Sequence, residues 1–186
     1  MIRPKTWVTN YDADLNLQTA DEISFINCAL SPFVNAVFPV GPHFRKSGYL
    51  TALEGYPMTK TDIKIYTTIG SENFDLLVFE VKCPQSTSED DLFMLSVKLQ
   101  LTLNRLIKNG VTEPVVYGVM VYDYECSFYR MSLTSSRIYT MMRIRTCTLP
   151  KDYENLHRVG HILPCFLQLR ELVNRMRQSL VHRLIG

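Results

Sequence analysis

Residues 74–84, FDLLVFEVKCP, place two opposite charges at the end of an otherwise apolar run. Six of the first eight residues are apolar, which predicts a buried strand. Because alternate residues of a strand share a face, Glu80 and Lys82 lie on the same side of it. A buried ion pair often loses in desolvation what it gains in attraction. Charge at the end of this strand is easier to explain if a cation also lies there.

A second carboxylate is expected beside Glu80. Asp62 lies 18 residues upstream in TDIKIYTTI, a strand candidate that the turn GSEN joins to residues 74–82 as an antiparallel pair. Two adjacent carboxylates repel unless a divalent cation binds both, and oxygen-only ligands suit Mg²⁺ better than zinc. Lys82 would orient or activate a water, or stabilise charge in the transition state. Asp75 is the rival to Asp62, but its place at the end of a turn favours a structural role.

Residues 92–108 carry conflicting patterns. LSVKLQLTLN alternates apolar and polar residues, which by periodicity alone predicts a strand. The residues are mostly helix formers, however, and the run exceeds the usual strand length. It also lies between Ser88–Asp91, spaced like a capping box, and Asn109–Gly110, a C-cap pattern. We therefore predict a helix, with Lys98 and Arg105 solvated or reaching a phosphate backbone, and with one apolar stripe formed by Leu92, Leu95, Leu99, Leu103 and Leu106.

The other segments complete an α/β chain. A first helix opens near Asp21 and is interrupted near Pro32. YLTAL precedes the two strands described above, and residues 114–148 contain two or three further strands rich in Val, Ile, Tyr and Thr. A last helix runs from Leu163. This order predicts a mixed central sheet flanked by helices, in a single domain of residues 1–186 whose residues 150–186 form a C-terminal helical extension.

The pattern of Asp62, a turn, and then Glu80–Val81–Lys82 resembles the PD-(D/E)XK nuclease superfamily. That family has a restriction-endonuclease-like core in the order helix, three strands, helix, strand. The resemblance implies a Mg²⁺- or Mn²⁺-dependent endo- or exonuclease, with Asp62 and Glu80 as metal ligands and Lys82 as the partner of the attacking water. DNA is the expected substrate in preference to RNA. The alternative is a catalytically inactive module that keeps the fold to bind protein or nucleic acid.

Two further positions follow from the same resemblance. Many members carry an acidic residue on the helix before the motif and a polar residue on the helix after it. Glu22 matches the first as a third metal ligand, and Gln100 matches the second as a catalytic residue. Gln100 and Asn104 are only similar to the family's Q-x-x-x-Y, because Asn104 replaces the aromatic. The wider chain also looks like uncharacterised fungal proteins, a likeness that implies no function.

Composition narrows the class of protein. A formal charge of +2 does not by itself indicate a nucleic-acid partner, but residues 130–186 carry ten Lys or Arg against three acidic residues. That excess suits either a phosphate-bearing partner or a solvated helix face. Five widely spaced cysteines and an N-terminus without an apolar core predict an intracellular protein, without distinguishing nucleus from cytoplasm. No membrane contact is expected, and a homodimer or a larger assembly stays open.

Other catalytic classes find little support. The chain has no G-x-S-x-G, P-loop or G-x-G-x-x-G motif. His157, His161 and Cys165 have the spacing of a metal-binding helix face, but Gly160 and Pro164 are expected to interrupt that helix. A zinc site there is therefore not favoured.

Overall fold

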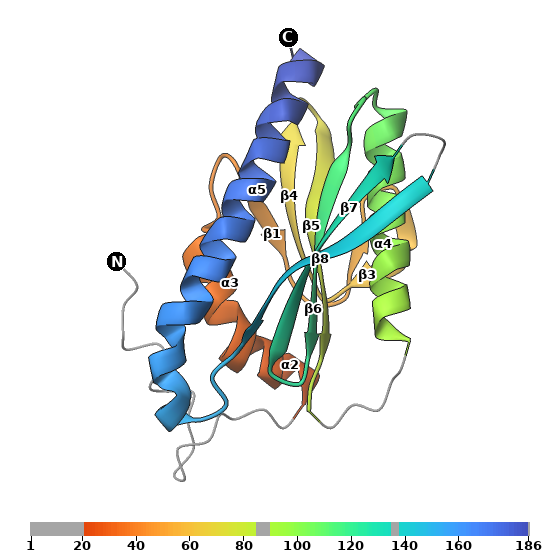
Figure 1. The fold of residues 1–186 in the computed structure, drawn as a ribbon. Helices are drawn as coiled ribbons and strands as arrows, with labels where there is room; N and C mark the ends of the chain where they lie inside the picture. Colours follow the sequence, from red (N-terminus) through yellow and green to blue (C-terminus); the bar gives the residue numbers. More distant parts are fainter. Residues whose placement is uncertain (1–20, 85–89, 135–137, 186) are drawn as a thin grey trace.

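The computed structural model describes residues 21–84, 90–134 and 138–185 and is organised around one six-stranded mixed sheet (Figure 1). The strand order is β1-β4-β5-β6-β7-β8, in which only β5 and β6 run parallel. The strands are β1 (Arg45–Ser47), β4 (Ile63–Ile69), β5 (Glu72–Lys82), β6 (Val115–Tyr122), β7 (Glu125–Thr134) and β8 (Ile138–Thr148). A separate hairpin pairs β2 (Thr51–Leu53) with β3 (Tyr56–Thr61).

Strand β5, which contains residues 74–82 of the segment FDLLVFEVKCP, lies at the centre of the sheet. Its residues 74–79 are all buried, because helices cover both faces. A parallel neighbour requires a crossover connection, and α4 (Asp91–Lys108) supplies it between β5 and β6. Three strands of the main sheet thus lie between the first helical segment and α4, and β6 follows. The predicted α/β fold with a mixed central sheet is confirmed.

Helix α4 lies on one face of the sheet, and α5 (Val159–Ile185) lies on the other beside α3 (Ser31–Val37) (Figure 1). On the α5 side, Phe166 stacks on Phe33 and meets Phe128 edge-on. On the α4 side the contact is very close, because a Cβ added at Gly118 would lie 2.8 Å from Leu99 Cδ1. Glycine at this position lets the helix sit directly on β6.

The predicted helix over residues 92–108 is confirmed. Four leucines of its predicted stripe are buried, namely Leu95, Leu99, Leu103 and Leu106, whereas Leu92 is 46% exposed. Leu92 instead lines an open hollow beside strands β6, β7 and β8. Asp90 is the N-cap position, and the expected capping residue Ser88 lies outside the described residues. Burial of the apolar stripe therefore decides the conflict between the strand and helix patterns.

One of the two expected interruptions of helices is wrong. Near Pro32 the chain stays helical, but a π-helical segment (Ile26–Leu30) interrupts the α-helical pattern between α2 (Glu22–Phe25) and α3. Helix α5, by contrast, continues through Gly160 and Pro164. Pro164 lies just after the first turn and removes only the bond to the carbonyl of residue 160. The long buried face beyond it, which includes Phe166, outweighs that loss.

The region before β4 is also more divided than expected. The sequence predicts strands at 49–53 and 61–69, but β1 and β3 were missed, and β4 begins only at Ile63. Asp62 lies in a bend between β3 and β4 rather than within a strand. The bend lets the hairpin leave the main sheet at the point where β5 becomes charged. Among the helices that the structure describes, none is long and apolar enough to span a membrane.

Candidate active site

Asp62 and Glu80 lie side by side at the C-terminal end of β5. Ile63 pairs with Phe79, so one further step of the antiparallel register places Asp62 opposite Glu80. The backbone N–H of Val81 donates a 2.7 Å hydrogen bond to Asp62 Oδ2. Both carboxylates are buried, with 5% of Asp62 and 7% of Glu80 exposed. The strand that carries Glu80 therefore also positions the second carboxylate.

The two carboxylates perturb each other. Burial raises the pKa of Asp62 to about 7, and the charge of Glu80 adds to the rise, while the hydrogen bond from Val81 opposes it. Burial also raises the pKa of Glu80 above its ordinary value, against the effect of Lys98. Carboxyl groups with raised pKa values concentrate at functional sites, because such sites tolerate a cost in stability. A bound cation would remove much of the cost in stability of burying the two carboxylates together.

Lys98 is part of this cluster, although the sequence assigned it to solvent or to a phosphate backbone. It is only 5% exposed, and its ammonium donates a hydrogen bond to Glu80 Oε2 from α4. That assignment is wrong because α4 turns Lys98 towards the sheet together with its buried leucines. The available signal was its spacing, since Lys98 lies three residues after Leu95 and next to Leu99 on the apolar side of the helix.

Lys82 lies at the open side of the cluster between two further acids. Its Nζ is 3.7 Å from Glu22 Oε2 and 3.8 Å from Asp91 Oδ1. Partial burial acts to lower the pKa of Lys82, but surrounding carboxylates outweigh it and raise the pKa above the ordinary lysine value. In order of effect, these are Glu22, Asp91, Glu80 and Asp62. Lys82 is therefore held as an ammonium and not as a neutral amine.

Glu22 and its neighbours form the rim of the site. Glu22 is the first residue of α2, whose N-cap Asp21 accepts a 2.7 Å hydrogen bond from Ser24 N. Tyr49 also reaches Glu22, and burial followed by the charge of Glu22 raises the pKa of its hydroxyl. No local pattern in the sequence predicts Tyr49 or Asp91 at this site. Both arrive through long-range packing, Tyr49 from the turn before β2 and Asp91 from the first turn of α4.

Gln100 is not directed at this cluster. It lies two residues after Lys98, so the helix turns it about 200° away from the side that faces Glu80. Within the described residues we find no hydrogen bond from Gln100 to Asp62, Glu80 or Lys82. Asn104, one turn further on, instead accepts a 2.5 Å hydrogen bond from Tyr139 on β8. The assignment of Gln100 as a catalytic residue stays a prediction that this geometry does not favour.

Asp75, the rival carboxylate, has a structural partner. It is 2% exposed and lies 3.0 Å from the ammonium of Lys64, which is itself buried. The backbone N–H of Glu54 donates a 2.7 Å hydrogen bond to its other oxygen, and Lys64 donates one to the carbonyl of Ala52. These bonds attach the β2–β3 hairpin to β4 and β5. The structural role expected for Asp75 fits this arrangement.

No cluster of three or more His, Cys, Asp or Glu side chains that could hold a metal ion is found among the described residues. Glu22 is engaged by Lys82, so its assignment as a third ligand stays a prediction. His161 and Cys165 do fall on one helix, but Cys165 Sγ donates to the carbonyl of His161 at 3.2 Å. Among the described residues, Asp62 and Glu80 form a pair of carboxylates and not a larger group of metal-ligating side chains.

Comparison with models of protein families, with curated proteins and with solved structures finds no match to this chain.

Proposed function

We propose that this chain is a divalent-metal-dependent nuclease that hydrolyses phosphodiester bonds of DNA, or less readily of RNA. One observation carries the proposal. Two buried carboxylates, Asp62 and Glu80, converge at one strand end, and a charged lysine, Lys82, follows two residues after the second. Sites that bind Mg²⁺ or Mn²⁺ in phosphate chemistry commonly use one or two carboxylates and complete the coordination with water and substrate phosphate.

The two carboxylates fit such an ion by their chemistry. They supply only oxygen donors, and a cation would offset the burial that raises the pKa of both groups and the charge of Glu80 that adds to the rise at Asp62. A bound Mg²⁺ or Mn²⁺ would polarise the phosphate and lower the pKa of the attacking water. The two side chains would hold that ion, with Asp62 kept in place by the N–H of Val81.

The lysines have separate tasks in this proposal. Lys82, fixed as an ammonium, stabilises negative charge that develops on the phosphate oxygens, instead of acting as a general base. Lys98 favours the ionised form of Glu80 against the effect of burial and binds one of its oxygens. Glu22 and Asp91 hold Lys82 from two sides and so restrict its position at the open edge of the site.

A specific observation also favours the second candidate, an inactive module that binds protein or nucleic acid. The ammonium of Lys98 already occupies one oxygen of Glu80, and Lys82 is paired with two acids. Such pairing can satisfy the buried charges without any metal. Activity measurements decide between the two candidates.

The test is cleavage of plasmid, single-stranded and duplex DNA, and of RNA, with Mg²⁺, with Mn²⁺ and with EDTA. We expect the wild type to cut only with a divalent ion. Glu80→Gln and Lys82→Ala should each lower the rate about 100-fold or more. The exposed residues Glu113 and Lys108 provide matched controls, as Glu113→Gln and Lys108→Ala should cut like the wild type. Absence of cutting on every substrate, or cutting that survives Lys82→Ala, would overturn the proposal.

A further inference from the structure

A groove continues from the candidate active site across the same face of the sheet. Strand register places Met120 beside Glu80 and Tyr122 beside Lys82. The next strand adds Ser127 opposite Met120 and Glu125 opposite Tyr122. Residues paired in adjacent strands share a face, so this row extends the charged end of β5 sideways. Asp91 belongs to both places, since it lies 3.8 Å from Lys82 and lines the groove.

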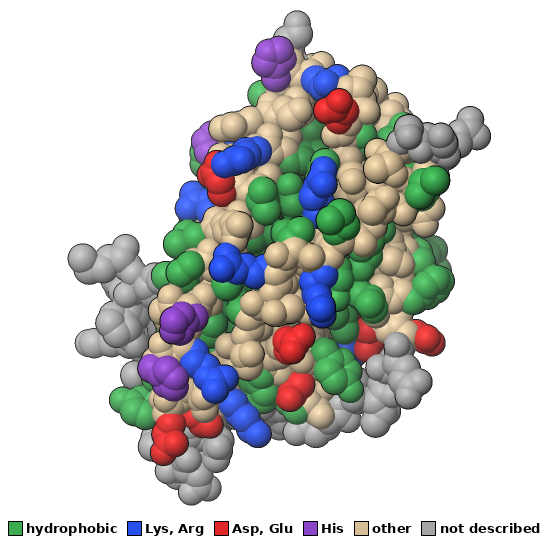
Figure 2. All heavy atoms as spheres, in the orientation of Figure 1, with side chains coloured by type: hydrophobic (Ala, Val, Ile, Leu, Met, Phe, Trp, Pro, Cys, Tyr) green, Lys and Arg blue, Asp and Glu red, His purple; other side chains and the backbone are tan. Residues whose placement is uncertain are grey.

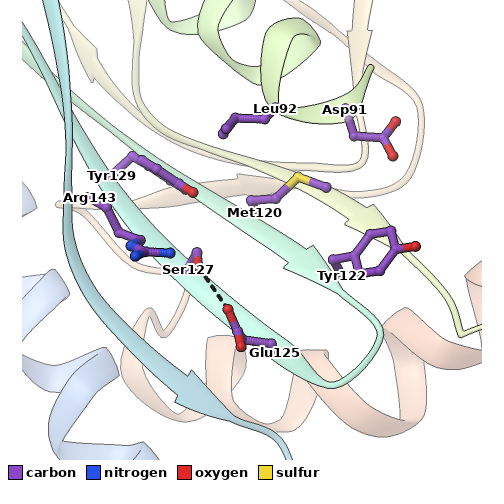
Figure 3. Close-up of a pocket in the computed structure, with 8 residues that line it drawn as sticks. All are labelled: Asp91, Leu92, Met120, Tyr122, Glu125, Ser127, Tyr129 and Arg143. Carbon is purple, nitrogen blue, oxygen red and sulfur yellow. Dashed lines mark hydrogen bonds between the residues drawn. The ribbon is translucent and has the colours of Figure 1, made fainter. Parts of the chain in front are cut away.

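The groove is an open hollow of about 380 Å³ between the start of α4 and strands β6, β7 and β8. Figure 3 shows Asp91 and Tyr122 at one end, Tyr129 and Arg143 at the other, and Met120 with Leu92 between them. From β5 to β8 the sheet spans three strand spacings, roughly 14 Å. The hollow therefore has the size for a nucleotide adjacent to the cleaved phosphate, with Arg143 at its far end.

The lining has aromatic and apolar surface available for contact. Tyr122 is 52% exposed and Leu92 is 46% exposed, and the half-buried ring of Tyr129 points into the hollow (Figure 3). Large apolar side chains left in contact with water beside a polar site indicate a binding surface. Nucleic-acid bases are the part of a nucleotide that stacks on such rings, and they can do so only when they are not paired within a duplex.

The charge of the groove also favours an unpaired strand over a duplex. Asp91 and Glu125 line the hollow together with Arg143, so the lining is not the strongly basic surface that grips a duplex through its phosphates. The wider surface agrees, because the Lys and Arg side chains on the face shown in Figure 2 are scattered among acidic and apolar ones. A single cation at the far end suits one phosphate of a strand whose bases are held by stacking.

We propose that this groove binds an unpaired strand of nucleic acid, with a base stacked on Tyr122 and a flanking phosphate on Arg143. The inference rests on the proposed nuclease function for the identity of the ligand, and it makes single strands the substrate class. Tyr129 extends the stacking surface towards Arg143, with which it pairs in the register of β7 and β8. DNA and RNA strands offer the same stacking and phosphate chemistry, and the experiment separates them.

The test measures fluorescence anisotropy of labelled oligonucleotides of about 12 nucleotides in EDTA, so that cutting cannot interfere. The probes are a single DNA strand, a single RNA strand and the corresponding DNA duplex. We expect the single strands to bind more tightly than the duplex. Tyr122→Ala should raise the Kd about 5- to 150-fold, whereas Tyr122→Phe should bind like the wild type because it keeps the ring. Tyr153→Ala, at an exposed tyrosine of the 3-10 helix η2 (Tyr153–Arg158), is the matched control.

The salt dependence of binding tests the proposed role of Arg143. Arg143→Ala should reduce the slope of log Kd against log salt by about 0.7, the value for one phosphate contact on a single strand. Arg170→Ala should leave the slope unchanged, because Arg170 is exposed on α5, on the opposite side of the sheet. Tighter binding of the duplex than of both single strands, or wild-type binding by Tyr122→Ala, would overturn the groove proposal.

Failure of the groove and failure of the nuclease function give different results. Strands that bind through Tyr122 without being cut under any metal condition would retain the groove and reject the nuclease. Cutting that requires Lys82 but treats duplex and single strand alike, and that is unchanged in Tyr122→Ala, would retain the nuclease and reject the groove. Lys82→Ala is expected to lose cutting while keeping most single-strand binding.

Discussion

Replacing Asp62 by asparagine should stabilise the metal-free protein near neutral pH. Asp62 is 5% exposed and lies beside a second buried carboxylate, Glu80. Asparagine has nearly the same shape, and its side-chain oxygen can still accept the hydrogen bond from Val81 N. The substitution therefore removes a buried charge and its repulsion from Glu80 while keeping the contact that positions the side chain.

The size of the effect follows from the pKa. In the folded protein the pKa of Asp62 rises from 3.8 to about 7, so between these values the folded state binds a proton that the unfolded chain has released. The stability contributed by this group is therefore complete below about pH 4 and is lost as the pH rises through 7. At about 1.4 kcal/mol for each pKa unit, the loss above pH 7 is at most about 4 kcal/mol.

Relaxation of the site and entry of water reduce that cost, so we expect Asp62→Asn to recover roughly 2 kcal/mol at about pH 8. For a chain of this length this is a rise in Tm of about 4–8 °C. The assay is thermal and urea unfolding of both proteins in EDTA from about pH 4 to 8. Glu80 contributes a pH dependence of the same sign in both proteins, so the difference between the two curves reports Asp62 together with its coupling to Glu80.

Asp75→Asn is the matched control and should have the opposite effect. Asp75 is equally buried, and burial raises its pKa too, but Lys64 at 3.0 Å opposes that rise, so neutralising Asp75 leaves a buried ammonium without its partner. Breaking such a pair costs about 3–5 kcal/mol. If Asp62→Asn were less stable than the wild type at about pH 8, or if the two curves ran parallel from pH 4 to 8, the reasoning about a strained carboxylate pair would be refuted.

Two further substitutions test the packing around the site. Lys98→Met should lower the free energy of unfolding by about 3–5 kcal/mol in urea, because it leaves Glu80 buried without its cation, and adding Glu80→Gln should restore much of it. Equal stability of the single and double variants would contradict this pairing. Gly118→Val should lower the free energy of unfolding by about 1–3 kcal/mol, since even a Cβ there would lie 2.8 Å from Leu99 Cδ1. Gly160→Ala, at a position with open space, should raise it by about 0.5–1 kcal/mol. Changes in Tm of the same sign in Gly118→Val and Gly160→Ala would argue against the close contact of α4 with β6.

Local patterns in the sequence were sufficient for the main elements of the fold. The apolar run of residues 74–82 and the leucine spacing of residues 92–108 each decide one element, and both are confirmed. Two of the short strands could not be found in this way. β1 has three residues, too few to show a period, and β3 contains Pro57, which weakens a strand pattern, whereas β2 falls within the strand predicted at residues 49–53.

Only part of the candidate site could be predicted from the sequence. Glu80 and Lys82 belong to β5, and Asp62 lies in the bend just before the neighbouring strand β4, so a turn and an alternating pattern suffice to bring them together. Lys98 and Asp91 reach the site because α4 crosses over β5 and β6, and no local pattern specifies which polar residue of a helix will face the sheet. Whether a buried lysine replaces or assists a metal ion is likewise a property of the assembled site.

The central claim is that Asp62 and Glu80 together hold a divalent cation. Calorimetric titration of Mn²⁺ into the metal-free protein tests it most directly. We expect one ion to bind per chain, and we expect Asp62→Asn and Glu80→Gln each to abolish that binding while the exposed-site variant Glu113→Gln retains it. Absence of binding in the wild type with both Mn²⁺ and Mg²⁺, or a site of unchanged affinity in both carboxylate variants, would contradict the claim.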